Sequence, residues 1–448
     1  MSPGMVGIVP ETQLEQLSSR GDLDPAVLKG MSSKQLNAAS ILALAWNTDV
    51  FTASDAISAT NLTRTTVISL CEELVGNGWL IELADARSTQ EYSKGRPARR
   101  YTLNALAGVG VGLDAGDTWM VARVSDLRGR VIGRAESREV VESSTVEERL
   151  AGAQSVVEAA LRDASVPPHH ALRLTIGVPA PVNSSGESPE RPGGFWHLMN
   201  PGMGTYFEQL GYSADVENDA TLAAIAEGLV GSGRGLSSFI AFLNKDGLGA
   251  GIVSDGRPVR GYHGAAGELW MLDYIDPLRH KGDAAAEPGH ARTRGINSAL
   301  GLDNTMRMQA TRGAALVEAT GSVLTGMERE AITAQVVLGA CAQGDAFACE
   351  IIDDTAQRLA RSCVTLAGML DVERIILSGT GPELAPFVER VNRLTPQYWH
   401  PNFPPPPIVL SELGGDVVVV GAIAQSLEWI RTNVFRLVST RAPAMAAL

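Results

Sequence analysis

Several short stretches of the chain carry the residue types that phosphoryl transfer to a hydroxyl group requires. Asp219 lies where an expected strand meets an expected helix, and its carboxylate can serve as a general base. Residues 245–256 read as a glycine-rich hairpin, in which Gly247 and Gly249 let the backbone approach a phosphate. Both features have plainer explanations, since Asp219 can simply cap its helix and the hairpin can be a tight turn without a ligand.

Two more stretches extend this set. Residues 109–129 predict a buried strand, a tight turn and a second strand, with Asp114, Gly116 and Thr118 in or beside the turn. Gly116 would let a ligand come close to the backbone, and the Thr118 hydroxyl can donate to a phosphate. Gly379 lies in a turn between a strand and a helix start, which is a further phosphate contact. After a second glycine-rich turn, Glu268 can accept hydrogen bonds from sugar hydroxyls.

The composition indicates a loop-rich α/β protein of two to three domains, with 448 residues and a hydrophobic share of 45%. We expect a cytoplasmic protein, because neither a signal peptide nor a run of about 20 apolar residues is present. The four cysteines are too scattered for a disulfide framework and form no C-x-x-C pair, so we expect reduced, buried thiols: Cys71, Cys341, Cys349 and Cys363.

Residues 31–104 predict a winged helix-turn-helix domain, behind a tail over residues 1–30. Three helical segments, with Ser33, Thr52 and Thr63 as N-caps, are followed by two strands that form a wing. An ordinary three-helix subdomain with a polar face is the alternative. A boundary at 103–108 then leads to a two-lobed α/β domain over residues 108–430, whose last helix ends at Ile430, and to a C-terminal tail over residues 431–448.

A DNA-binding role is compatible with the net charge of −13, because the field that matters is local. The stretch from Arg87 to Arg100 holds five basic residues and one acidic residue, Glu91. The candidate DNA contacts are the exposed start of the third helix and the basic wing: Thr63, Arg64, Thr65, Thr66, Ser69, Lys94 and Arg96.

The order and spacing of these motifs resemble the ROK family of repressors, open reading frames and kinases, from about residue 35 to residue 430. The resemblance is strongest in five segments: 111–129, 175–183, 216–228, 247–268 and 375–383. It implies an actin-like, sugar-kinase-like (ribonuclease H-like) ATPase fold in two lobes. It also implies a sugar site between the lobes, formed by Pro179, Ala180, Asn218, Asp219 and Glu268. Members with a winged head are mostly regulators of sugar use, and members without one are mostly sugar kinases.

The chain departs from this family at its zinc segment. Trp270 and Met271 stand where a glycine and a histidine are usual, and no cysteine lies between residues 71 and 341. His280 and His290 lie nearby but have no thiolate partners, so we expect no metal site.

The phosphate turn departs as well, because Asp117 replaces the second glycine of D-x-G-G-T. Its carboxylate would repel a triphosphate unless magnesium intervenes or the side chain turns outward. We therefore expect no cofactor, with ATP and magnesium only in a kinase alternative. The phosphate-binding residues are then vestigial: Asp114, Gly116, Thr118, Gly247, Gly249 and Gly379.

The sequence favours a sequence-specific transcription regulator, in the repressor mode, of carbohydrate uptake or metabolism. Its expected partners are double-stranded operator DNA and a sugar or sugar-phosphate effector, it acts as a homodimer or homotetramer, and it has no membrane association. Asp219 would then be a ligand residue rather than a catalytic base. One alternative is an ATP-dependent kinase of hexoses or amino sugars with a DNA-binding head. Another is a degenerate member that binds no sugar and only dimerises.

Overall fold

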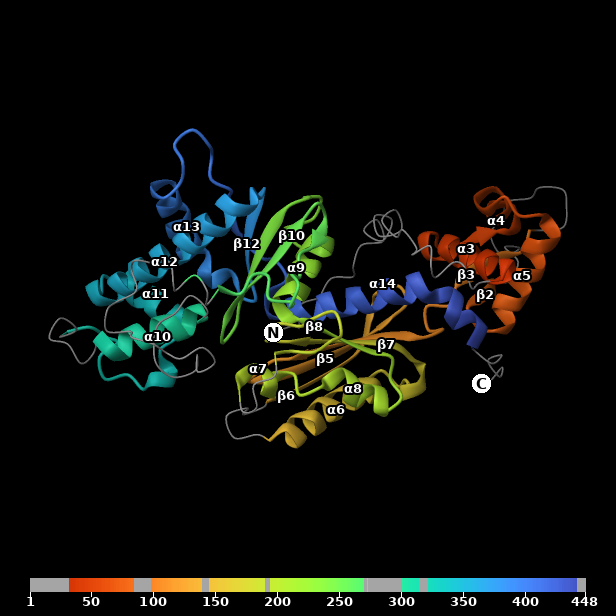
Figure 1. The fold of residues 1–448 in the computed structure, drawn as a ribbon, viewed down its shortest axis with the longest axis horizontal. Coiled ribbons are helices and arrows are strands. Elements are labelled where there is room, and N and C mark those ends of the chain that lie inside the picture. Colours follow the sequence, from red (N-terminus) through yellow and green to blue (C-terminus); the bar gives the residue numbers. More distant parts are fainter. Residues whose placement is uncertain are drawn as a thin grey trace.

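The structure is a computed structural model, and it has an N-terminal head followed by two lobes (Figure 1). It describes residues 32–83, 98–138, 145–189, 194–269, 272, 300–313 and 321–440.

The N-terminal head contains three helices and a small antiparallel sheet of order β1-β3-β2. Its elements are α3 (Ser33–Asn47), β1 (Phe51–Thr52), α4 (Ala53–Thr60), α5 (Arg64–Gly76), β2 (Leu80–Leu83) and β3 (Arg100–Leu103). Thr52 and Thr63 cap α4 and α5 as predicted. The predicted cap Ser33 is wrong by one residue, because Ser32 forms a capping box with Gln35 at the start of α3.

The first lobe is built on a five-stranded mixed sheet of order β6-β5-β4-β7-β8. Its strands are β4 (Val109–Ala115), β5 (Trp119–Asp126), β6 (Val131–Arg138), β7 (Ala171–Val178) and β8 (Ala214–Asn218). The helices of this lobe are α6 (Val146–Asp163), η4 (Pro168–His170), α7 (Phe195–Met199) and α8 (Met203–Gln209). The strands β4, β5 and β6 are antiparallel to one another, whereas β7 pairs in parallel with β4 and β8 pairs in parallel with β7.

The second lobe repeats this pattern, with a sheet of order β11-β10-β9-β12-β13. Its strands are β9 (Phe239–Asn244), β10 (Leu248–Ser254), β11 (Arg257–Pro258), β12 (Arg374–Ser378) and β13 (Ile408–Leu410). Its helices are α10 (Leu302–Gly313), η7 (Arg329–Ala331), α11 (Ala334–Ala342), α12 (Ala346–Leu370), η8 (Pro382–Leu384), α13 (Ala385–Leu394) and η9 (Thr395–Gln397). Again three antiparallel strands are followed by parallel ones, so the two lobes share one architecture.

Two helices, α9 (Asp219–Val230) and α14 (Val417–Thr440), pack against each other between the two sheets, with η10 (Gly414–Asp416) just before α14. They approach closely because Gly421 of α14 has no side chain: a Cβ there would lie 2.0 Å from the Leu222 carbonyl oxygen. Figure 1 shows α14 running on from the lobes to the head. The predicted C-terminal tail is therefore wrong over its first part, since the helix does not end at Ile430 but continues to Thr440.

The extension of α14 is held by the head. Ile430 and Val434 are buried in the same apolar cluster as Ile41 and Leu42 of α3. The hairpin between β5 and β6 adds polar contacts, because the Trp46 indole N–H donates to the Leu127 carbonyl oxygen at 3.0 Å. Burial of this apolar face explains why the helix persists beyond the point predicted from its sequence.

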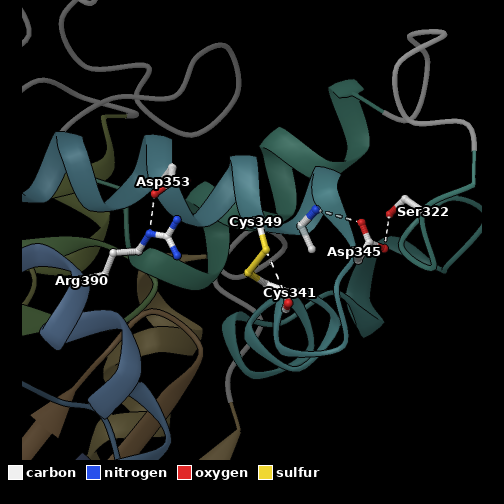
Figure 2. The surroundings of a disulfide bond; sticks show 7 residues. Ser322, Cys341, Asp345, Cys349, Asp353 and Arg390 are labelled. Atoms are coloured by element: carbon white, nitrogen blue, oxygen red, sulfur yellow. Dashed lines mark hydrogen bonds and ion pairs between the residues drawn. A yellow bond between two sulfur atoms is a disulfide. The ribbon is translucent and has the colours of Figure 1, made fainter.

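One expectation about the cysteines is also wrong. Cys341 and Cys349 form a disulfide bond, whereas Cys71 and Cys363 are free and buried as expected (Figure 2). The chain reverses between α11 and α12 at Gly344, which has a φ of +91°. The reversal brings the end of α11 beside the first turn of α12, although the two cysteines are eight positions apart in sequence. Among the described helices, none is both long and apolar enough to cross a membrane.

Candidate functional site

The start of α9 presents two neighbouring polar residues between the lobes. Asn218 is the N-cap: its Oδ1 accepts from the Thr221 N–H at 3.0 Å, and its Nδ2 donates to the Ala180 carbonyl oxygen at 3.1 Å. Asp219 is thus not the cap that its position allowed. Asp219 is 9% exposed, and its Oδ1 accepts from the Ala220 N–H at 2.8 Å. The arrangement places a buried carboxylate at the N-terminus of a helix.

Lys245 reaches this position from the β9–β10 hairpin of the second lobe. Its Nζ donates to Asp114 Oδ2 at 2.6 Å, so the ion pair joins the two lobes. Asp114 is 4% exposed, at the end of β4. Lys245 was missed as a site residue in the sequence, although a lone cation inside a glycine-rich hairpin is a signal that could have found it.

Asp219 and Lys245 each shift the pKa of the other. Burial raises the pKa of Asp219 to about 7, an effect that Lys245 opposes and that the nearby carboxylates Asp114 and Glu268 reinforce. Burial acts to lower the pKa of Lys245, but the carboxylates around it prevail and the pKa is raised. These include Asp117, so this side chain adds negative charge near Lys245. The lysine is charged at neutral pH and serves as the counter-ion of the site.

A second bridge between the lobes uses the threonine predicted to bind phosphate. The Thr118 hydroxyl donates to Asp246 Oδ2 at 2.7 Å. The Asp246 backbone carbonyl accepts from Asn304 Nδ2 at 2.8 Å and from the Gly301 N–H at 3.1 Å, which ties the hairpin to the start of α10. We call Asp114, Thr118, Asp219, Lys245 and Asp246 the inter-lobe cluster.

A third contact between the lobes lies on the other side of Asn218. Arg260 Nε donates to Glu217 Oε2 at 2.6 Å, and burial raises the pKa of Glu217 against the effect of that arginine. The loop that follows packs against the first lobe, because a Cβ on Gly264 would lie 1.9 Å from the Val182 carbonyl oxygen. This loop carries Glu268, whose charge acts on Asp219.

The remaining predicted residues are placed as follows. Ala180 is buried, follows Pro179 directly and accepts the Asn218 amide. Among the glycines of the hairpin, Gly249 packs with its Cα 
toward Ala220, where an added Cβ would lie 3.0 Å from the Ala220 Cβ. Gly247 pairs with Leu300, and Gly379, at φ +76°, lies against the Asn244 carbonyl oxygen. The contacts of Gly249 and Gly379 are thus with protein atoms of the second lobe and α9.

Near Gly116, an added Cβ would lie 2.7 Å from the Trp119 carbonyl oxygen and 3.6 Å from Lys245 Nζ. The absence of a side chain there leaves room for the turn and for the lysine ammonium. The space predicted for a ligand phosphate beside this glycine is therefore bordered by a cation of the chain itself.

In the head, the start of α5 is open to solvent. Thr63, Arg64, Thr65 and Ser69 are exposed and Thr66 is half-buried. The wing residues Lys94 and Arg96 lie outside the described residues, as does Arg87. Arg99, counted in the basic stretch, pairs with Glu72 at 2.8 Å and with Glu82 at 3.5 Å.

The zinc segment also falls mostly outside the described residues, including Trp270, Met271, His280 and His290. Within the part of the chain that is described, no three His, Cys, Asp or Glu side chains gather as a metal site would require.

Comparison with known proteins adds the following. The family model described as ROK family matches residues 110–428. A glucokinase of Halalkalibacterium halodurans is 29% identical over 164 residues, which cover 37% of this chain and 48% of that protein. A xylose repressor of Caldicellulosiruptor bescii is 24% identical over 273 residues, covering 60% of this chain and 66% of the repressor. The chain spans about half or less of the first curated relatives that it matches.

Two solved structures show the same fold. A ROK family transcriptional regulator, homolog of E. coli MLC protein, superposes with a TM-score of 0.62 at 20% identity, covering 89% of this chain and 98% of that one. A ROK family glucokinase from Streptomyces griseus, in complex with glucose and AMPPNP, gives a TM-score of 0.55 at 22% identity, covering 71% and 99%. Two lobes of mixed sheets and helices are therefore common to regulators and kinases.

Proposed function

We propose that this chain, which belongs to the ROK family, is a sugar-responsive DNA-binding transcription regulator whose kinase-like lobes bind an effector without phosphorylating it. The observation that carries this proposal is the head, in which three capped helices and a small sheet leave the start of α5 exposed. This order of elements supports a winged helix-turn-helix, in which we assign α5 as the recognition helix. The likeness to the regulator structure, which covers 89% of the chain, supports the same reading.

The exposed face of α5 has the chemistry of a major-groove reader. Arg64 is the first residue of the helix and is exposed, and Thr65 and Ser69 follow on the accessible side. A guanidinium can bind guanine or phosphate, and hydroxyls can bind either base edges or phosphate oxygens. We assign operator binding to this face, with Lys94 and Arg96 of the wing as additional contacts.

The helix α14 and the hairpin between β5 and β6 connect the head to the lobes, so a movement of the lobes can displace the head. The 24 residues of α14 span about 36 Å at ~1.5 Å per residue. The helix contacts α9 near its start and the head near its end, while Arg128 Nη2 donates to the Thr48 carbonyl oxygen at 3.2 Å. An effector that favours one arrangement of the lobes would thereby shift the position of the heads, and DNA affinity would change by its differential binding to the two states.

The inter-lobe cluster argues against catalysis. A magnesium-bound triphosphate needs free carboxylates for the metal and free donors for the phosphates. Here the Asp114 carboxylate accepts from Lys245, and the Thr118 hydroxyl donates to Asp246. In this arrangement the residues do not fit a magnesium nucleotide, so we derive no phosphoryl transfer. Xylose repressors among the relatives favour a repressor of carbohydrate uptake or metabolism.

The test is binding of the full chain to DNA fragments that flank its own gene, with and without sugars. Arg64→Ala is expected to weaken selective binding about fivefold or more, the loss of ~1–3 kcal/mol typical of a base-reading arginine. Arg138→Ala, which removes an exposed arginine at the end of β6, is the matched control and should leave binding unchanged. Selective binding that survives Arg64→Ala unchanged would refute the assignment of α5.

A second candidate function is an ATP-dependent kinase of hexoses or amino sugars. One observation favours it: Asp219 has a pKa of about 7, which suits a general base at neutral pH. ATP turnover that depends on a sugar and is abolished by Asp219→Asn would establish this function. Turnover that persists in that variant would come from a contaminating enzyme and would leave the regulator as the better proposal.

A further inference from the structure

A pocket lies between the loop after β7 and the loop after β11, and none of its described lining residues belongs to the inter-lobe cluster. Its volume is about 330 Å³, at the lower end of the range of small-molecule sites. The described residues that line it are Asn183, Glu187, Ser188 and Pro189 of the first lobe and His263 of the second. None of these residues has a role in the function proposed above.

The first-lobe wall of this pocket is a preformed turn. Asn183 Oδ1 accepts from the Ser185 N–H at 2.9 Å and from the Glu187 N–H at 3.0 Å. Ser188 is buried, and its hydroxyl donates to the Pro181 carbonyl oxygen at 2.7 Å while accepting from Asn200 Nδ2 at 3.0 Å. The wall therefore needs little ordering when a ligand binds, which lowers the entropic cost of binding.

On the side of the second lobe, one described residue lines the pocket, and an exposed aromatic ring lies next to it in the loop, outside the lining itself. His263 is exposed and offers ring nitrogens to hydroxyl groups. The preceding residue, Tyr262, is 92% exposed, and its ring meets that of His263 edge-on with centroids 4.7 Å apart. An aromatic face held in solvent can pack against the C–H face of a sugar.

The charges around the pocket restrict its occupant. Glu187 contributes a carboxylate to the lining, and Glu268 follows His263 by five residues in the same loop. Arg260, the cation of this loop, is paired with Glu217 at 2.6 Å. A phosphate or a carboxylate in the pocket would meet negative charge, whereas hydroxyl groups can donate to Glu187.

The pocket is within reach of a ligand held at Asn218 and Asp219. The Ala180 carbonyl oxygen accepts from the Asn218 amide at 3.1 Å, and Asn183 lies three positions further along the chain. Three steps along the chain span at most about 11 Å, since an extended chain covers ~3.3–3.6 Å per residue. A sugar of two units could therefore place one unit beside Asp219 and the other in the pocket.

We propose that this pocket is a subsite for the second, uncharged sugar unit of a disaccharide or glycoside effector. This subsite rests on the proposed function, because the first sugar unit of the effector occupies the site beside Asp219. Because the walls come from both lobes, the second unit would bridge the loop after β7 and the loop after β11. The effector is accordingly larger than a monosaccharide, and the pocket determines its preference for a longer chain.

The test is calorimetric titration of the full chain with two matched pairs of sugars, xylose with xylobiose and glucose with cellobiose. In at least one pair the disaccharide is expected to bind about tenfold or more tightly than the monosaccharide, equivalent to ~1.4 kcal/mol. Tyr262→Ala and His263→Ala should remove this advantage and leave monosaccharide affinity within about twofold of the wild type. Phe403→Ala removes an exposed aromatic ring elsewhere on the second lobe and is the matched control.

Three results would overturn the subsite: no disaccharide preference in either pair, equal weakening of both sugars in the variants, or no binding of any of the four sugars. The outcome is separable from that of the proposed function. A sugar that changes operator affinity without any disaccharide preference would leave the regulator in place and remove the subsite. A disaccharide preference that disappears in the variants would support the subsite even if no selective DNA binding were found.

Discussion

Asp219→Asn is expected to stabilise the protein by an amount that grows with pH. The pKa of Asp219 is raised from its ordinary value of 3.8 to about 7 in the folded protein. Between these two values the folded state holds a proton that the unfolded chain has released, so the carboxylate costs more stability as pH rises. Asparagine keeps an oxygen for the Ala220 N–H and carries no charge, so it removes this cost.

The magnitude follows from the two pKa values. One pKa unit corresponds to ~1.4 kcal/mol, so the raised pKa of Asp219 lowers the free energy of unfolding by about 2 kcal/mol near pH 5 and by about 4 kcal/mol near pH 8. The advantage of the variant should therefore grow by about 2–3 kcal/mol over this window, with most of the increase below pH ~7.

Urea unfolding of both proteins at several pH values, followed by tryptophan fluorescence, measures this difference. Glu208→Gln, which neutralises an exposed carboxylate on α8, is the control and should show no such trend. An Asp219→Asn advantage that is constant with pH, or larger near pH 5 than near pH 8, would refute the reasoning that burial is the dominant effect on this group.

Three further predictions concern stability. Lys245→Met should lower the free energy of unfolding by about 3–5 kcal/mol, because it leaves the buried Asp114 carboxylate without its cation. Urea titration should show that part of this stability returns in the double variant with Asp114→Asn. An equal loss of stability in the single and the double variant would contradict the pairing. Reducing the Cys341–Cys349 disulfide should cost about 2–3 kcal/mol, as expected for a short closed loop, so a reductant should lower the Tm of the wild type but not of Cys341→Ser. Gly251→Ala should lower the Tm because its Cβ would lie 2.0 Å from the carbonyl oxygen of residue 220. Gly339→Ala, where the added Cβ meets no atom within 4 Å, should be neutral or stabilising by ~0.5–1 kcal/mol. Equal effects of the two substitutions on Tm would argue against close packing at Gly251.

Much of the fold followed from short-range signals. The caps Thr52 and Thr63 were predicted because a hydroxyl at a helix start bonds to an N–H three residues on, within the same segment. Asp219 was likewise expected where a strand meets a helix, and α9 begins at this residue directly after β8. The membership of the family was likewise contained in the order of motifs along the chain.

Other features depend on residues that only folding brings together. The Lys245–Asp114 pair joins positions 131 apart, and the Thr118–Asp246 bond joins positions 128 apart. No local pattern specifies such contacts, because they require the two lobes to be placed against each other. The sequence therefore could not show that the Thr118 hydroxyl, predicted to bind a phosphate, donates instead to Asp246.

By itself, the sequence determined the order of the units, the start of α5 as an exposed polar face, and Asp219 at the head of α9. The tertiary structure alone decided that α14 continues to Thr440, because apolar burial against the head outweighs the weak local signal for its end. It also decided that Lys245 serves as the counter-ion of the site, since a buried carboxylate is stabilised by whichever cation the fold brings within reach.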